Sequence, residues 1–105
     1  MIFAPQMLDA IVAGRKTQTR RKSGRYRVGS SYALQPGRGK PGLAGIRIRI
    51  TEKRKVRIGE ISTADALAEG FDSRARFLEY FAMLHGNFDP AGWIYAYTFE
   101  VERCR

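Results

Sequence analysis

Cysteine and histidine are almost absent from this sequence, which has one of each in 105 residues. The single thiol, Cys104, excludes an internal disulfide framework and leaves too few thiolates for a zinc site. Its position beside the C-terminus favours a spectator role. His85 stands near the end of an expected helix, where a structural role is favoured, and the carboxylates show no metal-ligand spacing. We therefore expect no metal and no other cofactor.

Long apolar runs are missing as well. Even the longest falls far below the roughly 18 residues that a membrane-spanning helix needs. The opening segment, Met1–Gly14, has no cationic head and carries Asp9 within its apolar part, unlike a secretory signal. We therefore expect a cytoplasmic protein without a membrane segment. Its length fits one domain, residues 1–105, and we expect a monomer.

Carboxylates are scarce in the first half of the chain. Residues 1–57 carry 15 Lys and Arg side chains against Asp9 and Glu52, and the whole chain has a formal net charge of +9. A basic half on a small protein more often faces a polyanion, above all nucleic acid. A membrane surface is disfavoured, because no basic amphipathic helix is visible. The charge therefore predicts RNA or a nucleotide-like ligand as the partner.

The apolar and turn residues that are present predict an α+β protein. Pro5 suits the first turn of a helix that Gly14 can end, and Ser62 and Ser73 can cap two later helices. Alternating patterns predict strands, and the expected strands are Met1–Ala4, 17–22, 31–35, 46–50, 55–61 and 93–101. We expect the last of these to be central, with Trp93 in the core. The order predicts a small, strongly bent sheet or barrel flanked by short helices.

The stretch AGRKTQTRR, residues 13–21, concentrates four cations and two threonines behind the first expected helix. Taken alone, Lys16 is expected to be a solvated cation just after the C-terminal end of the helix. If its basic neighbours converge on a partly dry cleft, burial and like-charge repulsion lower its pKa. An ordinary lysine pKa near 10.4 must fall considerably before lysine serves as a base at neutral pH. Lys16 and Thr19 can line one pocket only if Lys16 lies in the turn before the strand.

Several motifs in order carry a family resemblance. AGRKTQTRR is followed by YRVGSSYAL, GRGKPG, IRIRIT, ISTADALAEGF and a final FEVE. This set resembles the ASCH domain family, a branch of the PUA-like folds, over nearly the whole chain. The resemblance implies an ASCH fold, which is a small mixed β-barrel flanked by short helices.

The family includes small bacterial N4-acetylcytidine amidohydrolases that use a lysine, a threonine three residues later and a downstream glutamate. Carried over, the resemblance implies Lys16, Thr19 and Glu69 as catalytic residues, and Arg21 matches the arginine that closes the motif. Thr19 or a water would attack the amide, Lys16 would act as base, and Glu69 would protonate the leaving amine or position Lys16. Arg21 or backbone N–H groups would stabilise the oxyanion.

Two other functions stay open. A non-catalytic RNA-binding module would use a phosphate track of cations, with aromatic rings stacking on bases. The candidate binding residues are Arg15, Arg21, Tyr26, Arg38, Lys40, Arg47 and Arg49. A metal-free ribonuclease comes third. We place hydrolysis of the N4-acetylcytidine amide first. The long loop QPGRGKPGLAG, absent from the compact amidohydrolases, leaves the natural substrate open.

Overall fold

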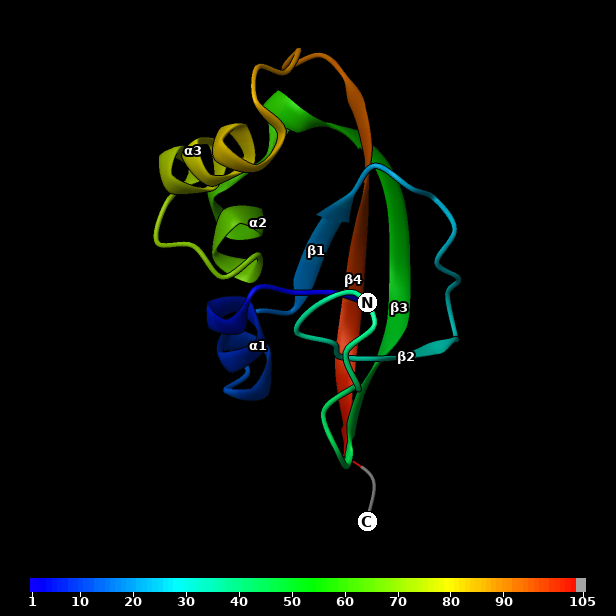
Figure 1. Ribbon diagram of the computed structural model, residues 1–105. Helices are drawn as coiled ribbons and strands as arrows, with labels where there is room; N and C mark the ends of the chain where they lie inside the picture. Colours follow the sequence, from blue (N-terminus) through cyan, green and yellow to red (C-terminus); the bar gives the residue numbers. More distant parts are fainter. Residues whose placement is uncertain (104–105) are drawn as a thin grey trace.

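Within residues 1–103, which the structure describes, four strands form one antiparallel sheet with helices packed against it (Figure 1). The structure is a computed structural model, and Cys104 lies outside its described residues. The elements in chain order are α1 (Pro5–Val12), β1 (Gln18–Arg21), β2 (Ser31–Ala33), β3 (Ile46–Arg57), a 3₁₀ turn η1 (Ile58–Glu60), α2 (Thr63–Ala68), α3 (Arg74–His85) and β4 (Trp93–Arg103). The predicted α+β class is confirmed.

The sheet is open rather than a closed barrel. Its strand order is β1-β4-β3-β2, and every pairing between neighbours is antiparallel. The two edge strands are short, with four residues in β1 and three in β2. They do not pair with each other, so the sheet bends without closing. The β1 edge stays free of strand pairing, and the candidate site forms there.

The middle of the sheet is a long ladder of β3 against β4. The strand predicted at 46–50 and the first three residues of the strand predicted at 55–61 join into the single strand β3, which pairs from Ile46 opposite Arg103 to Arg57 opposite Trp93. The rest of the second prediction is wrong, because Ile58–Glu60 form the 3₁₀ turn η1. A bulge between Ile50 and Glu52 shifts the register. Such a bulge adds one residue and increases the local twist, which lets one strand follow a strongly bent sheet. The strand predicted at Met1–Ala4 is absent, and only an isolated bridge joins Ile2 to Gln35.

Two hydrophobic clusters cover opposite faces of the central strand β4. The first cluster joins α1 to the isoleucines of β3 and includes Tyr97 and Phe99 of β4. The second packs the apolar faces of α2 and α3 against the other face, where β4 contributes Ile94. Burying apolar surface on both faces of a strand stabilises the folded state by about 25 cal/mol for each Å² removed from water. The prediction that the last strand is central is therefore confirmed.

Trp93 was expected in the core but is 55% exposed. It opens β4 on the face opposite to that of its neighbour Ile94, which is buried in the second cluster. The Arg57 guanidinium covers its ring at 4.3 Å from the centroid, and Lys55 approaches at 5.7 Å. Cross-strand cation–π contacts of this kind stabilise an aromatic ring that remains near water. The alternating pattern predicted the strand correctly, but it could not show how far the helices extend over it.

The predicted helix ends are confirmed. Ser62 and Ser73 each accept a hydrogen bond from a backbone N–H of the first turn, as N-caps do. Gly14 follows α1 with φ of +81°, a conformation that favours glycine. None of the helices within residues 1–103 is long and apolar enough to cross a lipid bilayer.

Candidate functional site

The turn after α1 places Lys16 immediately before β1. The N–H groups of Arg15 and Lys16 both donate to the carbonyl of Ala10, at 2.9 and 3.1 Å. Next, the Thr17 N–H donates to the carbonyl of Ala68 at the end of α2 (2.8 Å). These bonds tie the turn to both helices, so Lys16 lies outside the regular strand. The structure thus meets the condition that sequence analysis set for Lys16 and Thr19 to share a pocket.

The Lys16 side chain is almost completely buried, with 4% of its surface exposed. Its Nζ donates to the Glu69 carbonyl at 2.7 Å and lies 3.5 Å from Glu69 Oε1. Glu69 follows the last residue of α2, so the ammonium group meets the negative end of the helix dipole. Gly70 has φ of +97°, and a Cβ built there would lie 3.4 Å from the Lys16 Cβ.

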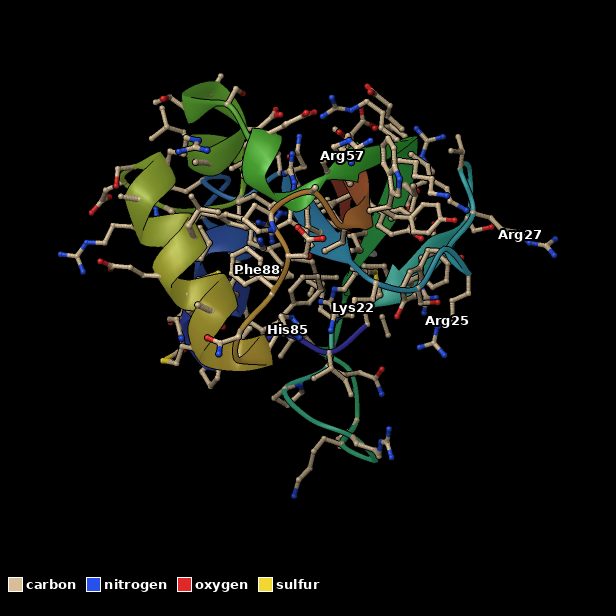
Figure 2. All side chains as sticks on the ribbon, turned by 90° about the horizontal axis from the view of Figure 1, so that it is seen from above. Lys22, Arg25, Arg27, Arg57, His85 and Phe88 are labelled. Atoms are coloured by element: carbon tan, nitrogen blue, oxygen red, sulfur yellow. The ribbon has the colours of Figure 1, made fainter. Side chains whose placement is uncertain are left out.

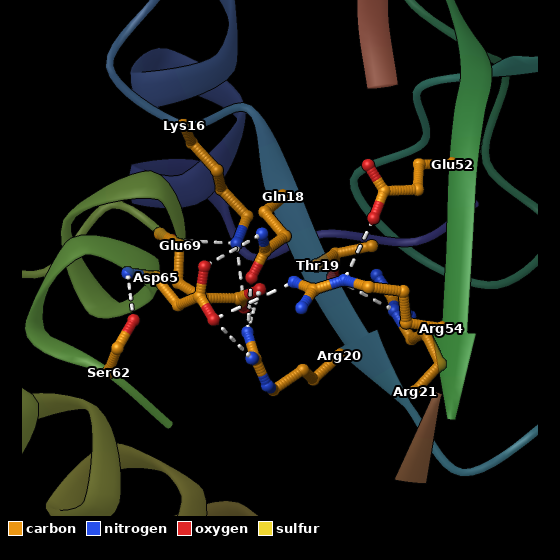
Figure 3. Close-up of polar contacts among 10 residues, drawn as sticks. All are labelled: Lys16, Gln18, Thr19, Arg20, Arg21, Glu52, Arg54, Ser62, Asp65 and Glu69. Atoms are coloured by element: carbon orange, nitrogen blue, oxygen red, sulfur yellow. Dashed lines mark hydrogen bonds and ion pairs between the residues drawn. The ribbon is translucent and has the colours of Figure 1, made fainter. Parts of the chain in front are cut away.

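A network of ion pairs surrounds Glu69 (Figure 3). Arg20, from β1, donates through Nη1 to Glu69 Oε2 at 3.1 Å and reaches Asp65 through Nη2 at 3.3 Å. It also donates to Gln18 Oε1. Both Arg20 and Glu69 are buried, so their attraction is screened little by solvent. The Glu69 carboxylate is therefore shared between two cations, with Arg20 held at the shorter distance.

Burial governs the charge state of Lys16. Desolvation is the largest effect and lowers the pKa of Lys16, because water no longer stabilises the ammonium form. The Glu69 carboxylate raises the pKa, while Arg21 and Arg20 lower it further. The net direction is downward from 10.5. The crowding of cations thus acts on Lys16 in the direction that general-base chemistry requires, despite the adjacent carboxylate.

Asp65 is the outer member of the network. Burial alone raises the pKa of its carboxyl, but a hydrogen bond from Gln18 and the charges of Arg20 and Arg54 outweigh burial and lower it. The carboxyl remains ionised at neutral pH. It therefore holds the Nη2 end of the Arg20 guanidinium, next to the Nη1 end that contacts Glu69.

Thr19 and Arg21 continue along the edge strand. Thr19 is buried, and its Oγ1 accepts a hydrogen bond from Arg21 Nε at 3.3 Å. The Arg21 guanidinium lies 4.7 Å over the ring of Phe3 and donates to the carbonyl of Ile2 at 2.7 Å. These contacts fix both side chains. No hydrogen bond within residues 1–103 joins Thr19 Oγ1 to Lys16 Nζ.

A pocket of about 370 Å³ lies between α1, β1 and α3. Lys16, Thr19 and Glu69 all line it, together with Arg20 and Arg21. Its remaining wall is largely apolar and aromatic, formed by Phe3, Phe71, Phe77, Tyr80, Phe81 and Leu84. The structure therefore brings the three residues proposed as catalytic into one concave site. Its volume lies within the roughly 300–1,000 Å³ typical of small-molecule sites.

The predicted binding residues do not form one surface. Tyr26 is buried and packs edge-on against Tyr32 and Tyr97, so it serves the core. The predicted cations other than Arg21 are exposed. They line neither this pocket nor a second pocket that adjoins it, and they are Arg15, Arg38, Lys40, Arg47 and Arg49. Arg49 is 3.4 Å from Glu100 and 3.9 Å from Glu102 on β4. The expected phosphate track along β3 is thus partly neutralised by its own sheet.

The sequence analysis did not predict that Arg20 and Asp65 belong to the ion-pair network around Glu69. It counted Arg20 only as a nearby charge, because strand alternation places residues 19 and 20 on opposite faces. At the free edge of the sheet both faces meet the pocket, so Thr19 and Arg20 both line it. A basic side chain inside a threonine-rich strand was the available signal. Within residues 1–103 no group of three or more metal-ligating side chains occurs that could hold a metal ion.

The structure therefore combines an open antiparallel sheet with a lysine-containing pocket at the β1 edge. An ASCH domain from Lactobacillus crispatus has this fold, with a TM-score of 0.73 and 23% identity over 90% of this chain and 69% of that one. A protein from Enterococcus faecalis of the family DUF984 matches with a TM-score of 0.64 and 26% identity, over 91% and 69%. No family model and no curated protein matches the chain. The chain therefore has the fold of an ASCH domain.

Proposed function

We propose that the pocket at the β1 edge binds a cytidine-like base and hydrolyses the acetyl amide of N4-acetylcytidine. The observation that carries this proposal is the convergence of Lys16, Thr19 and Glu69 on one aromatic-walled pocket, with Lys16 buried. Aromatic rings suit a flat pyrimidine, which they contact over its faces. A buried lysine with a lowered pKa suits a reaction that begins with proton removal.

The reaction consumes one water and yields acetate and the free amine of cytidine. A nucleophilic oxygen attacks the acetyl carbonyl while neutral Lys16 takes its proton. The C–N bond then breaks as the amine nitrogen gains the proton that Lys16 took from the nucleophile, while the Glu69 carboxylate positions Lys16. Since no hydrogen bond joins Lys16 to Thr19, a water held between them is the better-placed nucleophile. Thr19 then orients that water.

Arg20 and Arg21 complete the chemistry. Both line the pocket and carry a positive charge next to the reacting amide. The Arg21 guanidinium is already fixed at the pocket wall, because its Nε donates to Thr19 Oγ1 and its Nη2 donates to the carbonyl of Ile2. A fixed donor in a dry site stabilises a developing oxyanion without reorganisation. We assign the oxyanion to the Arg21 guanidinium, whereas Arg20 acts through the charge state of Lys16.

Chromatographic detection of cytidine released from N4-acetylcytidine tests the proposal. We expect turnover by the wild type and its loss in Lys16→Ala and Thr19→Val. The matched control is Arg15→Ala, which removes an adjacent cation that is exposed and lines neither pocket. An acetyl group retained on the protein would identify Thr19 as nucleophile instead of water. Absence of turnover by folded wild-type protein would refute this activity.

A further inference from the structure

A second pocket of about 380 Å³ adjoins the first. Ile2 and Arg21 line both pockets, so the two cavities meet across these side chains. The second pocket is lined further by Arg25, Tyr26, Tyr32 and Gln35. Lys22 lines the first pocket next to this junction. A ligand larger than a base can therefore extend from one pocket into the other.

The junction has an uncompensated positive charge. Arg21, Lys22 and Arg25 line these pockets, and none of them forms an ion pair within residues 1–103. Glu69 is the only carboxylate among the described residues that line either pocket, and it pairs with Lys16 and Arg20. By contrast, Arg49 and Arg54 elsewhere in the sheet have acidic partners. Three cations without acidic partners beside a base-sized pocket create a positive potential that attracts an anion.

Two of these cations are already oriented. Arg21 is held through Nε and Nη2 by Thr19 and by the carbonyl of Ile2. Arg25 donates to the Tyr26 hydroxyl at 3.0 Å, and its guanidinium lies 5.0 Å over that ring. Neutral partners fix each guanidinium without removing its charge. A guanidinium has five N–H donors, so both retain donors for an oxyanion such as phosphate.

The pKa of His85 responds to the same positive charges. It lines the first pocket, and burial together with the charges of Lys22 and Arg21 lowers its pKa. Viewed from above, Lys22 lies between His85 and Arg25, while Arg27 points away from the molecule (Figure 2). The histidine is the only one in the sequence, so its proton resonances are unambiguous.

We propose that the ligand of this site carries a phosphate, which binds at the junction formed by Arg21, Lys22 and Arg25 while its base occupies the first pocket. This inference rests on the proposed function for the base, and it narrows the substrate class from a free nucleoside to a phosphorylated one. The phosphate belongs either to a mononucleotide or to the backbone of a single-stranded RNA. Both sources offer the same oxyanion to the same guanidinium groups.

Binding of cytidine and of cytidine monophosphate, measured by calorimetry with the wild-type protein, tests the inference. We expect the nucleotide to bind at least several-fold more tightly. Lys22→Ala and Arg25→Ala should remove that difference and leave the affinity for cytidine unchanged. Arg27→Ala is the matched control, because this exposed arginine lies two residues from Arg25 and lines neither pocket.

The resonances of His85 give a second readout that needs no turnover. A bound phosphate should raise the pKa of His85, because a negative charge offsets Lys22 and Arg21, whereas cytidine should not. A short single-stranded RNA with one cytidine distinguishes the sources. Tighter binding of RNA, with a steeper salt dependence, indicates backbone phosphate, and equal binding indicates a mononucleotide.

The outcomes separate this inference from the proposed function. If cytidine binds and phosphate adds no affinity, the phosphate site is wrong and the base pocket stands. If neither cytidine nor the nucleotide binds, both proposals fail. If the nucleotide binds more tightly but the gain survives in Lys22→Ala and Arg25→Ala, the phosphate lies elsewhere and the inference is overturned.

Discussion

Two buried cations, Lys16 and Arg20, share the carboxylate of Glu69. Arg20 contacts Oε2 at 3.1 Å, whereas Lys16 Nζ lies 3.5 Å from Oε1. Because the attraction weakens with distance, Lys16 receives the smaller share of the stabilisation. The positive charge of Arg20 also lowers the pKa of Lys16 directly. At the scale of single residues, Arg20 is therefore a positioning residue that favours the neutral lysine.

Replacing Arg20 with Met should raise the pKa of Lys16, since a nearby positive charge disappears and Glu69 is left to the lysine. A smaller fraction of Lys16 is then neutral at pH 7, so kcat/KM for N4-acetylcytidine should fall several-fold. The rising limb of the pH–rate profile should move to higher pH. Rates measured from about pH 6 to about pH 10 check this expectation.

The conservative variant Arg20→Lys is the control for this experiment. It keeps the charge near Lys16 but loses the guanidinium fork, so the position of the limb should be largely restored. If Arg20→Met lowers the rate but leaves the rising limb of the pH–rate profile at the same pH, then Arg20 supports only the fold. Asp65 keeps a cation in either variant, because Arg54 Nη2 lies 3.6 Å from its carboxylate.

At the scale of elements, the end of α2 determines where the lysine and the glutamate meet. Gly70 leaves the helix at φ of +97°, and an alanine there would be strained whatever space is available. Its Cβ would also approach the Lys16 side chain at 3.4 Å. The geometry of this turn therefore matters for the site as well as for the helix.

Gly70→Ala should lower the free energy of unfolding by about 1–2 kcal/mol, the cost of a left-handed conformation for an L-residue. It should also reduce turnover, because relaxation of the strained backbone at residue 70 would displace the neighbouring Glu69, whose carbonyl accepts a hydrogen bond from Lys16. Urea denaturation and the cytidine-release assay measure the two effects. Gly29→Ala is the matched control: φ is +87° there, and nothing lies within 4 Å of an added Cβ. Equal loss of turnover in both variants would contradict a local effect on Lys16.

At the scale of the whole molecule, the buried lysine makes stability depend on pH. The folded protein holds the Lys16 proton less tightly than the unfolded chain, whose lysine pKa is near 10.5. Between the lowered pKa and 10.5 the unfolded state binds more protons, so stability rises with pH across this window. Below the lowered pKa, both states carry the proton and this contribution is constant.

We therefore expect the free energy of unfolding of the wild type, relative to Lys16→Met, to increase as the pH rises from the lowered pKa of Lys16 toward 10.5. Urea denaturation of both proteins at each pH measures the difference, and contributions from other groups cancel. Parallel curves for the two proteins would show that Lys16 keeps an ordinary pKa.

Local patterns in the sequence predicted most of the elements. Pro5, Gly14, Ser62 and Ser73 mark helix ends through their own backbone or side-chain chemistry, and the structure confirms those ends. The alternation around Tyr97 predicted the central strand. These signals act within a few residues, so they can be read from the chain without knowledge of the fold.

Tertiary structure alone decided which residues far apart in the sequence come into contact. The sequence by itself determined the α+β class and, through the family resemblance, the choice of Lys16, Thr19 and Glu69. Only the fold decided that the sheet stays open, that Trp93 is exposed, and that acids on β4 face the cations expected to bind phosphate. It also decided that Arg20 shares a carboxylate 49 residues away. Burial and ion pairing depend on distances between segments, and local sequence patterns do not encode those distances.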